Sequence, residues 1–212
     1  MPTVPDQPSP PSLRQRRKAE TRQLVLEAAK ALFAELGFAQ TTIRVVARRA
    51  GVGLGTVMSH FPDKNALLSA ALLTDWNATL ARAMASLSPD QSWRDQLLHL
   101  CGAFFGYYAQ QPSLSRALLR EQLFNTQAWT TELAGLENQS LAMTAQVLAQ
   151  AQATGQIRAG VDCRQAAEAL FALYQYVVYT GLAQDPPEPQ AMRERLGGLT
   201  DLLLTGLAGS GA

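Results

Sequence analysis

Three short apolar-periodic segments, each closed by a glycine or a proline, follow one another near the start of the chain. They cover about residues 15–36, 43–50 and 54–60, and Gly37 and Gly51 follow the first two. Apolar residues at spacings of three and four are typical of amphipathic helices. Glycine ends a helix readily because it takes a left-handed conformation without a Cβ clash. The sequence therefore predicts three short helices, the last two joined by a tight turn.

Two short helices joined through residues 50–53 predict a helix-turn-helix unit of the DNA-binding type. In that geometry the later helix lies in the major groove, and Val57 and Phe61 point back to the core. The residues that this helix would present to DNA are Thr56, Ser59 and His60.

The charge is distributed unevenly along the chain, although the net charge is only +1. Residues 14–64 hold ten basic and four acidic residues, whereas residues 65–212 hold eight basic and twelve acidic ones. A small basic part joined to a larger acidic part predicts that the first part faces a polyanion.

Residues 41–68, TTIRVVARRAGVGLGTVMSHFPDKNALL, follow a basic segment that ends in Leu-Phe-x-x-x-Gly-Phe38. Over about residues 18–70 this pattern resembles the DNA-binding domain of the TetR family of transcriptional regulators. Gly53 stands where the family often has a Ser or Thr cap, Leu54 where it often has Lys, and Met58 where Tyr is usual. These changes remove side-chain hydrogen bonds, so we expect weaker or differently specific DNA recognition.

The resemblance implies a set of DNA-contacting residues. Thr42 and Lys64 sit at predicted helix starts, where free N–H groups favour a phosphate, and the fork of Arg44 can bond a guanine edge. Alternatives are that Thr42 only caps its helix and that Arg48 or Arg49 is a solvated charge. The full set is Arg17, Lys18, Thr42, Arg44, Leu54, Gly55, Thr56, Ser59, His60 and Lys64.

The rest of the chain also predicts helices and no strand, so the expected fold class is all-α. Asp63 is the predicted N-cap of a long helix, and Pro112 closes a segment that starts at Trp93. Further helices are predicted at about 113–124, 126–153, 163–184 and 189–207. We expect a disordered Pro-rich tail at residues 1–13, a helix-turn-helix domain at 14–62 and a helical effector-binding and dimerisation domain at 63–212.

The last two predicted helices carry more apolar surface than one buried face requires. Apolar residues surround almost the whole of 163–184, and 189–207 has a wide leucine stripe with Gly197 and Gly198. These helices predict a homodimer interface, which the resemblance also implies. A dimer would place two recognition helices in successive major grooves of a palindromic operator.

Aromatic residues concentrate in the middle of the chain, and few charges interrupt the apolar faces. This composition predicts an apolar cavity for a small, uncharged, hydrophobic effector. The candidate ligand-binding residues are Trp76, Phe104, Phe105, Tyr108, Phe124, Trp129 and Tyr174.

Several classes of protein are excluded at this level. Two cysteines and two histidines supply neither a disulfide framework nor a four-ligand metal site, so we expect no cofactor. The most apolar stretch, residues 169–183, is shorter than a membrane-spanning helix, and the first residues lack the apolar core of a secretory signal. We expect a cytoplasmic protein with no membrane segment.

The sequence thus predicts a ligand-responsive transcriptional repressor that binds double-stranded DNA as a homodimer and is released by the effector. The alternatives are an activator or an effector-independent DNA binder with the same helix-turn-helix domain. A helical enzyme is a further alternative, but no acid–base or nucleophile constellation supports it.

Overall fold

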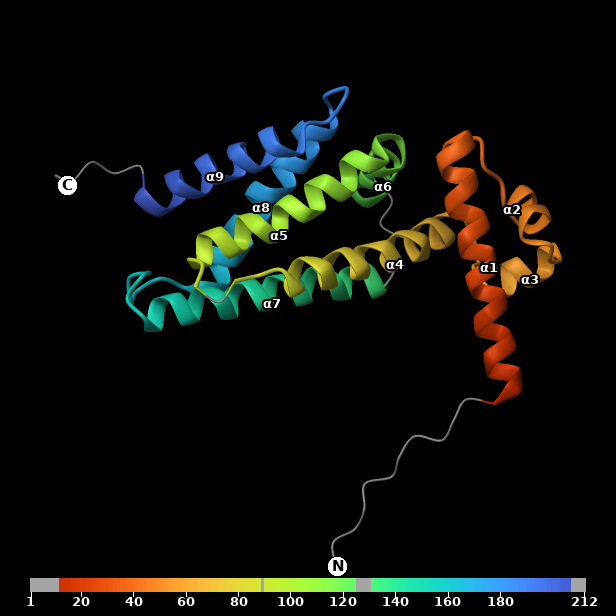
Figure 1. Cartoon of the computed structure of the whole chain (residues 1–212), viewed down its shortest axis with the longest axis horizontal. Helices are drawn as coiled ribbons and strands as arrows, with labels where there is room; N and C mark the ends of the chain where they lie inside the picture. Colours follow the sequence, from red (N-terminus) through yellow and green to blue (C-terminus); the bar gives the residue numbers. More distant parts are fainter. Residues whose placement is uncertain (1–11, 89, 125–130, 207–212) are drawn as a thin grey trace, which may run out of the picture. The chain divides into compact units, whose positions relative to one another are not determined.

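The computed structural model describes residues 12–88, 90–124 and 131–206, with side chains outside the description at 121–124 and 131–134. This described part contains nine α-helices and no strand, which confirms the all-α prediction (Figure 1). The chain forms two compact units that divide between Ala71 and Leu72, within α4. Over the described ranges, no helix is both long enough and apolar enough to cross a membrane.

The helices agree closely with the predicted segments. The first four are α1 (Leu13–Leu36), α2 (Ile43–Ala50), α3 (Leu54–His60) and α4 (Lys64–Ala85). The other five are α5 (Trp93–Gln110), α6 (Pro112–Phe124), α7 (Thr131–Ala153), α8 (Cys163–Leu182) and α9 (Pro189–Thr205).

Local hydrogen bonds explain how α1 begins and ends. It begins two residues earlier than predicted because Ser12 and Gln15 form a reciprocal capping box. Gly37 has the expected positive φ of 80°, but its ψ of 160° is not left-handed helical, so that detail of the prediction was wrong. The buried Thr41 hydroxyl shares its one proton between the carbonyls of Leu32 and Gly37, whose oxygens lie 3.2 and 2.9 Å away.

The turn between α2 and α3 has the predicted geometry. Gly51 is left-handed, with φ 68° and ψ 27°, and the following amide of Val52 donates to the carbonyl of Ala47 at 3.0 Å. Val57 on α3 and Phe61 after it are 0% and 2% exposed, as expected of core residues. Burying these side chains fixes which face of α3 is turned outward.

In the second unit, α8 packs against α7 and α9, and α9 also packs against α5 (Figure 1). One core cluster joins α5, α8 and α9 and includes Leu98, Phe105, Val177, Val178 and Leu196. A second joins α7 and α8 and includes Leu148, Ala167 and Leu170.

Two helices of this unit end earlier in the sequence than predicted. Helix α8 stops at Leu182 rather than at 184, and the Arg116 guanidinium binds the carbonyls of Leu182 and Gln184 at 2.7 and 2.8 Å. Helix α9 ends at Thr205, and the predicted start of α7 at 126–130 lies outside the described residues.

Candidate DNA-binding surface and apolar cavity

Helix α3 turns a continuous outer face to solvent. Its buried side, anchored by Val57, leaves the predicted contact residues Leu54, Gly55, Thr56 and Ser59 exposed. The Ser59 hydroxyl donates to the Thr56 carbonyl at 2.8 Å, so its oxygen remains available as an acceptor. A Cβ built on Gly55 meets nothing within 4 Å. The backbone of α3 is therefore open to close approach at its second position.

The start of α2 supplies a second set of exposed groups. The Thr42 oxygen accepts a hydrogen bond from the amide of Val45 at 3.3 Å, so this residue does cap the helix. Its hydroxyl proton can still be donated outward. Arg44 is exposed and has neither an ion pair nor a side-chain hydrogen bond within the described ranges.

Arg49 differs from Arg44 because it already has a carboxylate partner. Its guanidinium binds both oxygens of Glu35 on α1, at 2.8 and 3.2 Å. This hydrogen-bonded pair raises the pKa of Arg49. Arg49 therefore links α2 to α1, while Arg48 is exposed.

Lys64 is directed into the unit rather than outward. Its Nζ donates to the carbonyl of Phe38 at 2.8 Å and lies 4.2 Å from the centre of the Phe38 ring. Asp63 accepts from the amide of Ala66 at 2.7 Å, which confirms it as the cap of α4. A phosphate contact by Lys64 would have to compete with this internal contact.

His60 ends α3 next to the basic face of α1. Burial lowers the pKa of His60, and the charges of Lys18 and Arg22 lower it further. The Arg22 guanidinium lies 5.1 Å from the centre of the Phe61 ring. Arg22 was not among the predicted site residues, although its place one turn after Lys18 puts both on one helix face.

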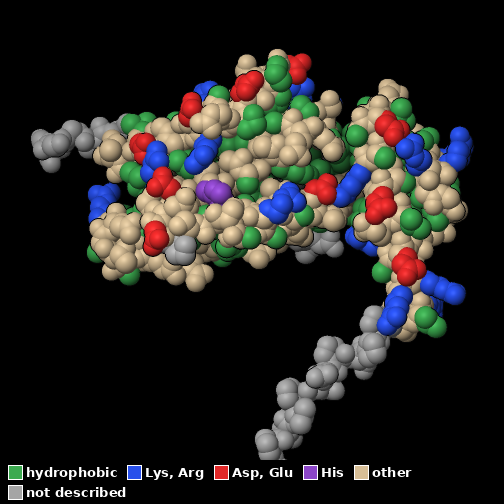
Figure 2. Space-filling model, viewed as in Figure 1, with side chains coloured by type: hydrophobic (Ala, Val, Ile, Leu, Met, Phe, Trp, Pro, Cys, Tyr) green, Lys and Arg blue, Asp and Glu red, His purple; other side chains and the backbone are tan. Residues whose placement is uncertain are grey.

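The first turns of α1 add further exposed cations. Figure 2 shows Lys and Arg side chains gathered where α1 begins. The exposed basic residues of this part are Arg14, Arg16, Arg17, Lys18 and Arg22. With Arg44 and the outer face of α3, they give this unit the positive surface on which DNA affinity depends.

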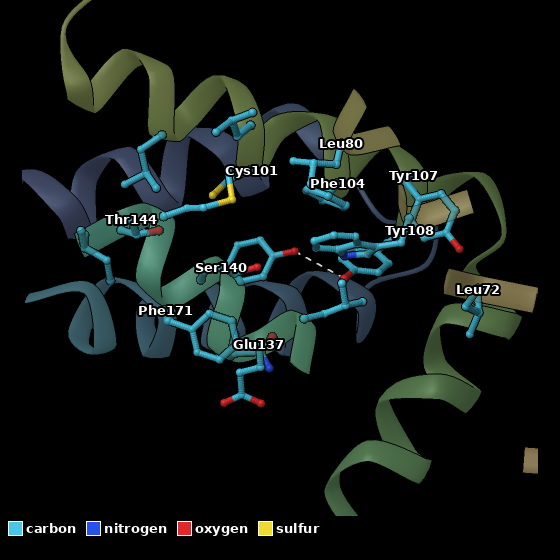
Figure 3. A pocket seen from close by; sticks show the side chains of 18 of the residues that line it. Leu72, Leu80, Cys101, Phe104, Tyr107, Tyr108, Glu137, Ser140, Thr144 and Phe171 are labelled. Atoms are coloured by element: carbon cyan, nitrogen blue, oxygen red, sulfur yellow. Dashed lines mark hydrogen bonds between the residues drawn. The ribbon is translucent and has the colours of Figure 1, made fainter. Parts of the chain in front are cut away.

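The second unit contains an apolar cavity of about 210 Å³ lined by residues of α4, α5, α6, α7 and α8 (Figure 3). Four of the predicted ligand-binding residues line it: Trp76, Phe104, Tyr108 and Tyr174. Phe105 does not line it and lies in the adjacent core at 0% exposure. The predicted Trp129 lies outside the described residues, as does the side chain of Phe124 at the end of α6.

Aromatic contacts and two hydroxyls define the cavity wall. The rings of Trp76 and Phe104 are 4.9 Å apart, and the hydroxyls of Tyr108 and Tyr174 are 3.4 Å apart. Burial raises the pKa of the Cys101 thiol to about 12, so this cavity residue is uncharged at neutral pH. Ser140 and Thr144 also line the cavity from α7, and neither was predicted from the sequence.

Helices α8 and α9 expose apolar residues outside the core, among them Tyr176, Tyr179 and Leu202. The Arg195 guanidinium joins the two helices because it donates to the Tyr176 hydroxyl at 2.8 Å. Gly197 is buried, and a Cβ added to it would lie 3.4 Å from Leu98, whereas Gly198 is exposed with open space around it.

Comparison with known proteins identifies the first unit. Residues 25–71 match the family described as bacterial regulatory proteins, tetR family. The chain is 25% identical to the HTH-type transcriptional regulator SrpR of Pseudomonas putida over 184 residues, which are 87% of this chain and 85% of SrpR.

Solved structures extend the similarity over both units. A TetR-family regulator structure from Rhodococcus sp. is 26% identical, with a TM-score of 0.63 over 88% of this chain and 99% of that one. The fold is also that of Thermus thermophilus FadR, at 24% identity and a TM-score of 0.68 over 90% and 97% of the two chains. The chain is therefore a transcriptional regulator of the TetR family, and residues 25–71 are its helix-turn-helix DNA-binding domain.

Proposed function

We propose that this regulator is a homodimeric repressor that binds a palindromic operator and is released by a small apolar effector. The observation that carries the proposal is the pairing of two features in one chain. One is an open α3 face with the exposed cation Arg44 nearby, and the other is the apolar cavity in the second unit. Residues 14–62 would serve DNA binding, residues 63–212 effector binding and dimerisation, and residues 1–13 would be a tail.

The exposed face of α8 and α9 supports the dimer. Tyr179 and Leu202 are 58% and 49% exposed, and large exposed apolar residues on adjoining helices are characteristic of protein interfaces. Gly198 would let the α9 helices of two copies approach closely. Two copies would present two α3 helices, as a palindromic site requires.

Two relatives support repression and control by a ligand. KstR of Mycobacterium tuberculosis, 28% identical over 139 residues, is a transcriptional repressor. Thermus thermophilus FadR is also a repressor, and its structure was solved in complex with lauroyl-CoA. By analogy, the cavity of this chain would hold the molecule that controls DNA binding.

Release requires that the effector prefer the conformation that does not bind DNA. To shift a two-state population from 1:99 to 99:1, the effector must bind that conformation about 5.5 kcal/mol more tightly. An effector that bound both conformations equally would leave DNA occupancy unchanged however high its affinity.

Selection of bound sequences from random duplexes with the purified full chain tests the DNA-binding part of the proposal. We expect a symmetric consensus, and bound duplex should be released in a titration with apolar compounds. An asymmetric consensus would contradict the dimeric assembly. Undiminished binding with every compound that occupies the cavity would favour an effector-independent DNA binder.

The substitution Gly198→Leu tests the dimer interface. The position has room in a single copy, so the chain should fold, but the added side chain should obstruct a second α9 and shift the protein to monomer in analytical ultracentrifugation. Gly135→Leu is the matched control, because that glycine also lies in a helix with open space around it. A Gly198→Leu protein that sediments as wild type would place the interface elsewhere.

A further inference from the structure

Two tyrosines from different helices meet within the apolar cavity. Tyr108 comes from α5 and Tyr174 from α8, and the dashed line in Figure 3 marks the hydrogen bond between their hydroxyls. The O···O distance of 3.4 Å is long, since O–H···O bonds cluster near 2.7–2.8 Å. The bond is therefore weak and can be exchanged for a shorter one.

Counting protons shows that this pair can donate to a third group. Two hydroxyls carry two protons, and the bond between them uses one. The other proton has no acceptor among the residues that the structure describes. Burial raises the pKa of both Tyr108 and Tyr174, so both hydroxyls stay protonated at neutral pH.

Neighbouring contacts restrain the Tyr174 ring and the Tyr108 backbone. The Phe105 ring stacks on the Tyr174 ring at a centroid distance of 5.5 Å and an interplanar angle of 19°. The backbone at Tyr108 is fixed by the Ser115 hydroxyl, which donates to the Tyr108 carbonyl at 3.0 Å. A donor held in this way loses little entropy when a ligand binds.

The surrounding wall favours an uncharged ligand. Its described residues include no Lys or Arg, and the carboxylate of Glu137 points away from the tyrosine pair in Figure 3. An ionised group placed beside the tyrosines would lose its hydration without a counter-charge. The volume of about 210 Å³ lies below the range of roughly 300–1,000 Å³ common for ligand pockets, which favours a small molecule.

We infer that Tyr108 and Tyr174 are the polar anchor of the cavity, and that it selects small uncharged apolar compounds with one hydrogen-bond acceptor oxygen, such as a ketone. This inference rests on the proposed function, in which the cavity takes the effector. Tyr108 or Tyr174 donates to the ligand oxygen, and the apolar wall covers the remainder.

Acetophenone and ethylbenzene test the anchor, because they have similar shapes and only the first has an acceptor oxygen. With the wild-type full chain, calorimetry should give acetophenone an affinity about five- to tenfold higher, the range of one neutral hydrogen bond. Tyr108→Phe combined with Tyr174→Phe should remove this preference and leave ethylbenzene binding within about twofold. Tyr107→Phe is the control, because Tyr107 also lines the cavity but its hydroxyl points away from the pair in Figure 3. The preference for acetophenone should persist in this variant.

The infrared carbonyl stretch of bound acetophenone gives a second measurement that needs no variant. Hydrogen bonding to a tyrosine should lower its frequency relative to acetophenone in a hydrocarbon solvent. Equal affinities of the two compounds for the wild type, or an unshifted carbonyl stretch, would overturn the anchor and leave the cavity as a binding site. Failure of both compounds to bind would overturn the anchor and the effector role together, whereas binding of both with undiminished DNA affinity would refute effector control alone.

Discussion

The two units differ in where they keep the groups that act on other molecules. The helix-turn-helix unit presents exposed side chains such as Thr56 and Arg44 on short capped helices. The second unit places Trp76, Phe104 and the tyrosine pair around an internal cavity. A surface site can change with little effect on folding, whereas a cavity wall is part of the core that holds the unit together. Function and stability should therefore be separable in the first unit and coupled in the second.

The largest expected effect is on the stability of the second unit. Phe105→Ala should lower its free energy of unfolding by about 3–5 kcal/mol, because a fully buried ring leaves a new cavity. Phe104→Ala should cost less, since Phe104 already borders the cavity, and should change ligand affinity instead. Urea denaturation of both variants checks the order. If Phe104→Ala lowered the free energy of unfolding more than Phe105→Ala, Phe104 rather than Phe105 would be the residue that fills the core.

In the first unit, Arg44→Ala should leave thermal stability unchanged and weaken operator binding by about 1–3 kcal/mol if Arg44 reads a base. If Arg44 instead holds a phosphate, affinity should fall evenly across DNA sequences. Fluorescence anisotropy with matched and scrambled duplexes distinguishes the two. Arg49→Ala is the control because its guanidinium is already paired with Glu35. Binding unchanged by Arg44→Ala would remove this residue from the interface.

A smaller effect with the opposite sign is expected at Thr200. Its side chain is 0% exposed, and its hydroxyl has no hydrogen-bond partner in the described part of the protein. Thr200→Val keeps the shape and removes the unsatisfied group, so it should stabilise the second unit by about 1 kcal/mol. Thr200→Ser, which keeps the hydroxyl and loses a methyl group, should destabilise it. A lower melting temperature for the valine variant would indicate a partner that the described residues do not supply.

The smallest effect is a pH dependence at His60. Because the folded pKa lies below the ordinary 6.5, the unfolded chain binds more protons between the two values, and the free protein should lose stability as the pH falls through this window. A phosphate beside His60 would raise its pKa, so DNA affinity should increase over the same pH change. Melting curves from pH 7.5 to 5.5 measure how stability changes with pH, and fluorescence anisotropy over the same range measures how DNA affinity changes. His60→Gln should reduce both pH dependences. If DNA affinity decreased together with stability as the pH is lowered, a phosphate contact by His60 would be excluded.

Much of the first unit could be predicted from the sequence because its signals are local. Caps at Thr42 and Asp63, the left-handed Gly51 and the inward Val57 all depend on residues a few positions away. The inward turn of Lys64 could not be predicted in this way. It depends on the Phe38 carbonyl and ring, 26 positions earlier in the chain.

The cavity was harder to predict because its wall and the core use the same residue types. Phe104 and Phe105 are adjacent aromatic residues, both nearly buried, yet one borders the cavity and the other fills the core. Only the rotation of α5 against its neighbours separates them, and that rotation is set by contacts far away in sequence. The same holds for Tyr108 and Tyr174, whose meeting depends on the packing of two helices.

Gly55 is a position at which selection for thermal stability would conflict with DNA binding. Nothing in the free chain requires glycine there, because its φ is not positive and a methyl group would have room. Alanine would favour the helix by roughly 1 kcal/mol, so a selection for robustness alone would choose it. If the α3 backbone must come close to a phosphate at that point, such a selection would enrich thermally stable variants that no longer bind the operator.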